Sequence, residues 1–192
     1  MNLTDYSFFQ AEDVVEIAKN LLGKTISVSD GPIHCTGIIS ETEAYAGPDD
    51  KASHAYGGRY TERTKTMYLS GGHCYVYLCY GIHKLFNIVT NKEGIPHAVL
   101  IRGAIPMNGV EHMQKRRKVS TASGLANGPG KFSQAFGIEM RDNAIPLQKD
   151  RIRIYDTIHD RDRYRIEAGP RVGIDYAEEH KDLPWRFRLI KV

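Results

Sequence analysis

The sequence has few cysteines and no long apolar run. Its 192 residues include only Cys35, Cys74 and Cys79. This small, odd number does not suit a disulfide framework and is typical of proteins from a reducing compartment. No apolar stretch approaches the roughly 20 residues that span a bilayer, and the N-terminal segment lacks the basic start of a secretory signal. We therefore expect a cytoplasmic protein that does not enter a membrane.

The chain also lacks a strong excess of one charge. Lysine and arginine number 26 against 23 acidic residues, which gives a net charge of +3 and a pI of about 8.7. This balance does not by itself indicate a nucleic-acid partner. Basic residues do cluster, in KRRK at 115–118, RDRYR at 161–165 and WRFRLIK at 185–191. Such clusters can contact phosphates, although each alone is more often a solvated face, so both interpretations stay open.

Internal repeats, low-complexity tracts and long flexible linkers are absent too, so residues 1–192 are expected to form a single domain. Apolar residues spaced three to four apart predict an amphipathic helix over 10–22, which Gly23 would end. Shorter helices are predicted over 107–118 and 130–136. The β-type runs are LGKTISVS, GIISETEAY, GHCYVYLCY, LFNIVT, AVLIRGA, RIRIYD and WRFRLIKV. We predict an α+β fold with a curved, mostly antiparallel sheet and peripheral helices.

A cluster of carboxylates stands out in ETEAYAGPDDKASHA, at 41–55. Strict alternation along a strand would place Glu41, Glu43 and Tyr45 on one face, together with Ile39. A carboxylate beside an aromatic wall can act as a base, because the wall excludes water while nearby donors keep the acid ionised. Taken alone, the pattern favours a solvent-facing strand edge followed by a polar turn.

A hairpin is predicted in GGHCYVYLCYGIHKLFNIV, at 71–89, with Tyr80 at or near its tip. A tyrosine at a tip is poorly placed for a core and well placed as a wedge between base pairs. Tyr77, nearer the body of the strand, could stack on an extruded base. Ordinary sheet packing is the alternative for both tyrosines.

Two other kinds of site are disfavoured by spacing. Cys74 and Cys79 are an odd number of positions apart, so on a regular strand they point to opposite faces and cannot share a metal ion. The segment GLANGPGKF has Leu125 and Phe132 where a phosphate-binding loop needs Gly and Ser or Thr. What remains there is a loop with Lys131 at the start of a helix, which suits either a phosphate contact or a plain turn.

Long ordered motifs along essentially the whole chain resemble the alkyladenine (3-methyladenine, or methylpurine) DNA glycosylase family. The motifs lie in the segment from Phe8 to Lys24, in ETEAYxGPxDxASHAxxGxxTxRxxxMY and YVYxxYGxHxxxNIV, and in VLIRG, NGPGKxxxAxGI, GPRVGI and PWRF. The resemblance implies a monofunctional enzyme that flips 3-methyladenine, 7-methylguanine or hypoxanthine-type purines out of duplex DNA. It implies hydrolysis of the N-glycosidic bond, with no cofactor or metal, that leaves an abasic site for base excision repair.

The resemblance also assigns the catalytic residues. It implies that Glu43 is the general base that activates a water molecule. Arg102 would help to hold that water, and the backbone carbonyl of Val172 would contact it. Glu41 lies two residues from Glu43 and suggests the paired carboxylates of inverting glycosidases, but the family places the chemistry on the second glutamate.

The remaining residues implied by the family bind DNA. Tyr45, His54 and Tyr77 would sandwich and orient the flipped base, and Asn87 would disfavour the exocyclic amine of normal guanine. Tyr80 would intercalate where the nucleotide leaves the helix. Two further residues, Arg59 and Lys131, lie in family segments near the DNA backbone. The expected partner is double-stranded DNA with damaged purines, bound by a monomer in the cytoplasm, or at the nucleoid if the source is prokaryotic.

The chemistry of the residues agrees with this interpretation. An alkylated purine is already cationic and a good leaving group, so one carboxylate can suffice. Two rival functions stay open: a nucleic-acid-binding module without catalysis, which leaves Glu43 without a role, and a hydrolase of free nucleosides, which does not need Tyr80.

Overall fold

The computed structural model describes residues 2–156 and 163–192, and its first two helices follow the short strand β1 (Asn2–Leu3). These are α1 (Tyr6–Phe9) and α2 (Val14–Leu21). The predicted helix over 10–22 is therefore shorter than expected at its start. The side chain of Asp13 accepts hydrogen bonds from the N–H groups of Val15 and Glu16, and so caps α2 at that point.

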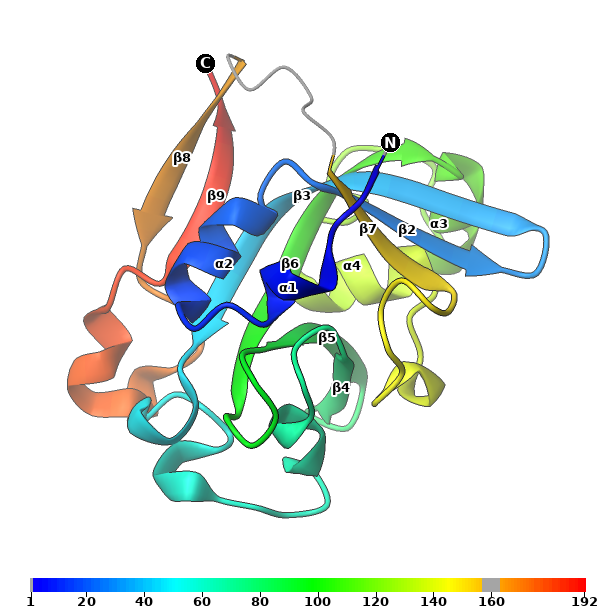
Figure 1. The fold of residues 1–192 in the computed structure, drawn as a ribbon. Coiled ribbons are helices and arrows are strands. Elements are labelled where there is room, and N and C mark those ends of the chain that lie inside the picture. The colour runs from blue at the N-terminus through cyan, green and yellow to red at the C-terminus, as the bar shows by residue number, and fades with distance from the viewer. Residues whose placement is uncertain (1, 157–162) are drawn as a thin grey trace.

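Nine strands of the described residues form a sheet in which all pairs are antiparallel. The strands are β1 (Asn2–Leu3), β2 (Thr25–Asp30), β3 (Ile33–Tyr45), β4 (Cys74–Cys79), β5 (His83–Thr90), β6 (His97–Asn108), β7 (Ile152–Asp156), β8 (Tyr164–Gly169) and β9 (Arg186–Lys191). The main path runs β1-β7-β2-β3-β6-β5-β4, while β9 pairs with β3 and β8 (Figure 1). The predicted α+β class and antiparallel sheet are confirmed, although β8 was not expected as a strand.

Two further helices, α3 (Val110–Arg117) and α4 (Pro129–Phe136), follow β6. Helix α4 matches the prediction within one residue, and Gly137 ends it with φ of 69°. Helix α3 begins later than predicted because Met107 and Asn108 belong to β6. Short 3₁₀ turns occur at Gly47–Asp49, Tyr56–Gly58, Lys65–Tyr68, Met140–Asp142 and Asp175–Asp182. No described helix is long and apolar enough to cross a membrane.

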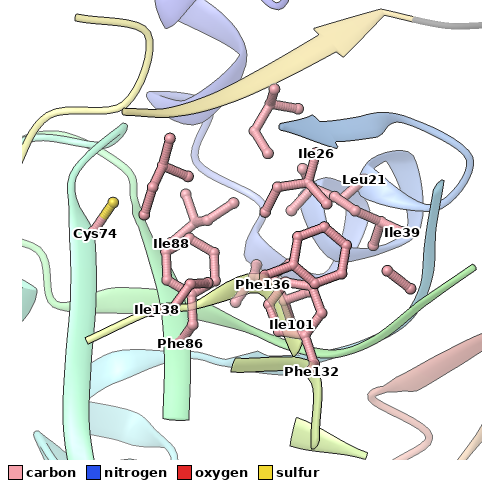
Figure 2. Close-up of a cluster of buried hydrophobic side chains, with 14 of the residues drawn as sticks. Leu21, Ile26, Ile39, Cys74, Phe86, Ile88, Ile101, Phe132, Phe136 and Ile138 are labelled. Atoms are coloured by element: carbon pink, nitrogen blue, oxygen red, sulfur yellow. The ribbon is translucent and has the colours of Figure 1, made fainter. Parts of the chain in front are cut away.

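The main core lies where α2 and α4 meet the sheet. Figure 2 shows Leu21 of α2 and Phe136 of α4 among Ile39 of β3 and Ile101 of β6. All four are fully buried. Each such side chain contributes about 1.5–3 kcal/mol by leaving water, so this packing holds the central strands firmly in place.

Strand β3 carries the carboxylate motif and departs from strict alternation. Its pairing with β6 has register shifts on both sides of Glu41, and β9 pairs with it from Glu41 to Glu43. Ile39 lies in the same core cluster as Ala44, although alternation would place the two on opposite faces. The predicted shared face of Ile39 and Glu43 is therefore wrong, because an irregularity of this kind changes which face a residue joins.

Candidate active site

A cavity of about 510 Å³ lies beside the end of β3. This volume is within the usual range for a small-molecule pocket, about 300–1,000 Å³. The predicted site residues that line it are Tyr45, His54, Tyr77, Tyr80, Asn87, Arg102 and Val172. The fold thus brings together residues from β3, β4, β5, β6 and three loops.

Glu43 is fully buried at the end of β3 and has hydrogen-bond donors around its carboxylate. The Tyr45 hydroxyl donates to Oε2 at 2.8 Å, and the Val172 backbone N–H donates to Oε1 at 2.8 Å. Arg102 Nη1 lies 3.3 Å from Oε1. Burial raises the pKa of Glu43, and the three donors oppose that rise. The result is a desolvated carboxylate held in one orientation.

Glu41 is connected to this carboxylate through Arg102. Arg102 Nε donates to Glu41 Oε1 at 2.9 Å, so one guanidinium contacts both glutamates. Arg186 of β9 lies 3.6 Å from the same Glu41 oxygen. Neither glutamate is itself part of the cavity lining, but Glu43 contacts three lining residues, Tyr45, Val172 and Arg102, whereas Glu41 contacts only Arg102 among them. Its contacts suit the orientation of Arg102 and not a second catalytic carboxylate.

Aromatic rings form the walls of the cavity. The rings of His54 and Tyr77 meet edge to face, with centroids 4.6 Å apart. His54 Nδ1 lies 2.9 Å from the Tyr75 hydroxyl. Burial, followed by the charges of Arg63 and Arg59, lowers the pKa of His54 to about 4. The imidazole is therefore neutral near pH 7 and can accept a hydrogen bond.

Arg63 was not predicted as a site residue, yet it lines the cavity. Its Nη2 lies 3.0 Å from His54 Nε2, and its guanidinium lies 4.8 Å from the centroid of the Tyr77 ring. A donor at Nε2 fixes the neutral tautomer of His54 with its proton on Nδ1. Arg63 stands in the TxR part of the motif, which was the available signal.

Tyr176, from the turn Asp175–Asp182, also lines the cavity and was not predicted. Its side chain is 65% exposed, while its hydroxyl donates to the Ala52 carbonyl at 3.2 Å. The ring is therefore fixed at the rim and still faces solvent. Nothing in its local sequence distinguishes it from an ordinary surface tyrosine.

Asn87 is a buried polar residue of the cavity wall. It pairs with Tyr75 across the β4–β5 hairpin, and its Nδ2 donates to the Tyr75 carbonyl at 3.1 Å. The side-chain amide is thus held by the backbone of the neighbouring strand. A fixed polar group at this position can select among ligands by their donors and acceptors.

Tyr80 lies in the turn of the predicted hairpin. Cys79 pairs with His83, so the turn consists of Tyr80, Gly81 and Ile82. The Tyr80 side chain is 90% exposed, and its backbone has φ of 50°, which is unfavourable for an aromatic residue. The expected hairpin and tip position are confirmed, and the side chain stands at the cavity rim.

Arg59 and Lys131 lie outside the cavity lining, and both are exposed. Lys131 is in the first turn of α4, as predicted. The Arg59 carbonyl accepts hydrogen bonds from Thr64 and Tyr68, which fixes the loop at that point. The structure therefore places the two cations on the outer surface, although the charge of Arg59 still contributes to the lowered pKa of His54 in the cavity wall.

The basic clusters are only partly free for a partner. Arg116 donates to the Ala135 carbonyl, and Arg188 forms an ion pair with Glu167. Arg186 contacts Glu41, as described above. Part of the cluster RDRYR, at 161 and 162, lies outside the described residues. These arginines chiefly connect elements of the fold.

The chain matches a family model described as methylpurine-DNA glycosylase over residues 7–191. A relative from Bacillus cereus is 46% identical over 191 residues, which cover 94% of this chain and 92% of the relative. A relative from Chlamydia pneumoniae is 48% identical over 192 residues, which cover 95% and 92%. Both carry the name "Putative 3-methyladenine DNA glycosylase".

The extent of these matches shows that the chain belongs to the methylpurine-DNA glycosylase family, as its motifs indicated. Such proteins hydrolyse N-glycosyl bonds, and their substrate is DNA. The enzyme is accordingly a DNA-3-methyladenine glycosylase of DNA repair.

Proposed function

We propose that the enzyme flips an alkylated or deaminated purine into the cavity and hydrolyses its glycosidic bond with a water molecule activated by Glu43. The observation that carries the proposal is the position of Glu43: fully buried, with Tyr45, Val172 and Arg102 around its carboxylate, next to an aromatic cavity. The product is a free base and an abasic site in DNA.

Glu43 is the proposed general base. Its raised pKa makes it a stronger base than an exposed carboxylate, while the surrounding donors favour its ionised form. The ionised group also stabilises positive charge that develops on the sugar. Arg102 is proposed to hold the water and the Val172 carbonyl to contact it, in addition to the observed N–H bond from Val172 to Glu43.

The proposed base pocket consists of Tyr45, Tyr77 and His54. Electron-rich rings favour a planar cation, and an alkylated purine is one. The guanidinium of Arg63, itself a planar cation, lies over the Tyr77 ring and supports this assignment. Asn87 is proposed to disfavour the exocyclic amine of normal guanine.

Tyr80 is the proposed wedge. Insertion of its exposed ring between base pairs would offset the loss of stacking when the nucleotide leaves the helix. Arg59 and Lys131 are proposed to contact DNA phosphates, since both are exposed cations. We propose that the enzyme acts as a monomer in the cytoplasm, at the nucleoid if the source is prokaryotic, and forms one domain over 1–192.

The substitution Glu43→Gln tests the proposed mechanism. Gln keeps the size and the acceptor oxygen but cannot take a proton, so we expect at least about a hundredfold loss of base release. Single-turnover release of free base from methylated duplex DNA measures the effect. Binding of the damaged duplex should persist. Base release by Glu43→Gln at the parent rate, with binding unchanged, would show that Glu43 is not the base.

A further inference from the structure

Resting on the function proposed above, we propose that Asp50 and Arg171 position the hydrogen-bond donors of Glu43, and are therefore positioning residues for the hydrolysis. Neither residue touches the Glu43 carboxylate. Their influence would pass through the three chain segments that they hold together: the end of β3, the loop after it, and the loop that follows β8.

The Arg171 guanidinium is the centre of this connection. Nη1 and Nη2 donate to the two carboxylate oxygens of Asp50 at 2.5 and 2.9 Å. Nη1 also donates to the Ala44 carbonyl at 2.9 Å, and Nη2 to the His180 carbonyl at 3.2 Å. Both side chains of the ion pair are completely buried. Asp50 further accepts the N–H groups of Ala46 and Ala52, which fixes the loop after β3.

The partners of Arg171 adjoin the two donors of Glu43. Arg171 directly precedes Val172, whose N–H bonds to Glu43, and Ala44 lies between Glu43 and Tyr45 in the chain. The guanidinium also lies 4.9 Å from the centroid of the Tyr45 ring. A single buried cation therefore holds the strand that carries Glu43, the ring whose hydroxyl donates to it, and the backbone that donates the second bond.

Trp185 also packs beside the Arg171 guanidinium and binds the strand that carries Glu43. Its ring lies 5.1 Å from the guanidinium, and its carbonyl accepts the Ala44 N–H at 2.9 Å. Arg171 Nε is buried and has no hydrogen-bond partner among the described residues. Because an unpaired buried donor is destabilising and a buried ion pair is weak evidence for stability, stability alone does not explain the group.

The inference makes a prediction about the ionisation of Glu43. The groups that face its carboxylate are Arg102 of β6, Glu41 and Tyr45 of β3, Val172, and more distantly Tyr77 of β4. Displacement of the Val172 N–H or the Tyr45 hydroxyl would raise the pKa of Glu43, because both stabilise the ionised form. Loss of the negative charge of Asp50, without any displacement, would instead lower the pKa of Glu43.

The experiment compares Asp50→Asn and Arg171→Lys with the parent. The Glu43 carboxyl is titrated by ¹³C NMR, with the signal assigned by its loss in Glu43→Gln. Arg171→Lys keeps the charge, so a purely electrostatic effect predicts no change. We expect both substitutions to raise the pKa of Glu43 by about one unit. The acidic side of the pH–rate profile for single-turnover base release should shift to higher pH by the same amount.

Trp185→Leu removes one of the two rings beside the Arg171 guanidinium and provides a milder variant should Asp50→Asn and Arg171→Lys fail to fold.

Arg151→Lys is the matched control. Arg151 Nη1 contacts the buried Asp142 at 2.6 Å, and Arg151 also donates to the Ser29 and Gly137 carbonyls, away from the cavity. This substitution should lower stability and leave the pKa of Glu43 unchanged.

An unchanged or lowered pKa of Glu43 in the folded variants at Asp50, Arg171 and Trp185 would overturn the positioning role. The NMR titration does not depend on activity, so this failure is distinct from failure of the proposed function, which would appear as unimpaired base release by Glu43→Gln.

Discussion

Two opposing effects act on the Glu43 carboxyl, and their balance suits a base. Burial disfavours its charge, while Arg102, the Val172 N–H and the Tyr45 hydroxyl favour it. His54, across the cavity, is affected differently. Burial and two arginines all disfavour its charge, so its neutral form persists to about pH 4. A carboxylate able to accept a proton thus lies behind the cavity wall, while an imidazole that stays neutral forms part of that wall.

His54 should make folding stability dependent on pH. Its folded pKa of about 4 is below its ordinary value of 6.5, so the unfolded chain binds more protons between these values. The contribution of His54 to the free energy of unfolding is therefore constant above about pH 6.5. It falls as the pH drops toward 4, by about 2 kcal/mol between pH 7 and pH 5.

Urea unfolding at pH 7 and pH 5 measures this dependence. In His54→Gln the contribution of His54 disappears, and the difference between the two pH values should be smaller by about 2 kcal/mol. An equal difference in parent and variant would mean that His54 titrates normally in the folded state.

At the level of secondary structure, the β4–β5 hairpin is the element on which the proposed DNA wedge depends. Its turn combines a large exposed ring with a left-handed backbone at Tyr80, a conformation that is usually left to glycine. Strain of this kind is found at functional sites, where it is balanced by the surrounding structure. The exposure of the ring at the turn, together with this backbone, is consistent with the proposed wedge.

Substitution of Tyr80 should separate stability from binding. Tyr80→Gly relieves the left-handed backbone, so we expect unfolding at the same or a higher denaturant concentration than in the parent. It also removes the ring, and binding of a damaged duplex should weaken at least about tenfold. Tyr80→Phe keeps the ring and is the control, with binding close to the parent. Equal binding by all three proteins would exclude the wedge.

The elements also show which features a sequence reveals. Local signals were sufficient for α4, where Gly137 marks the end, and for the hairpin, where Gly81 permits the reversal. They were insufficient for β8, because its first residues, Tyr164 and Arg165, belong to the run RDRYR, which indicates a basic patch and not a strand that pairs with β9. They also missed the register shifts beside Glu41, which depend on pairing with β6 and β9.

At the scale of the whole molecule, the site depends on contacts between distant segments. The motifs identified Glu43 and Tyr45 because both lie in one continuous stretch. They did not identify Arg171 as a partner of Asp50, since the two are 121 positions apart. They also gave no role to Tyr176, which lines the cavity and is held by a contact to Ala52, 124 positions away. Sequence reasoning therefore identified part of the cavity lining but not the long-range contacts that hold it in shape.

The whole molecule also combines opposite charges in different places. Exposed cations such as Lys131 lie on the outer surface, while the carboxylate of Glu43 is buried beside the cavity. This separation suits a polyanionic duplex outside and a cationic purine inside. A hydrolase of free nucleosides would need only the cavity. Comparing a lesion in duplex DNA with the same lesion as a free nucleoside therefore distinguishes the two activities.

Base release from duplex DNA and from a free nucleoside, measured side by side, tests the central claim most directly. Duplexes that each contain one 7-methylguanine or hypoxanthine are compared with the corresponding nucleosides, and the free base is quantified by chromatography. We predict release from duplexes and at least about a hundredfold slower release from nucleosides, since only a duplex engages Tyr80 and the outer cations. Equal or faster turnover of the free nucleosides would contradict the account.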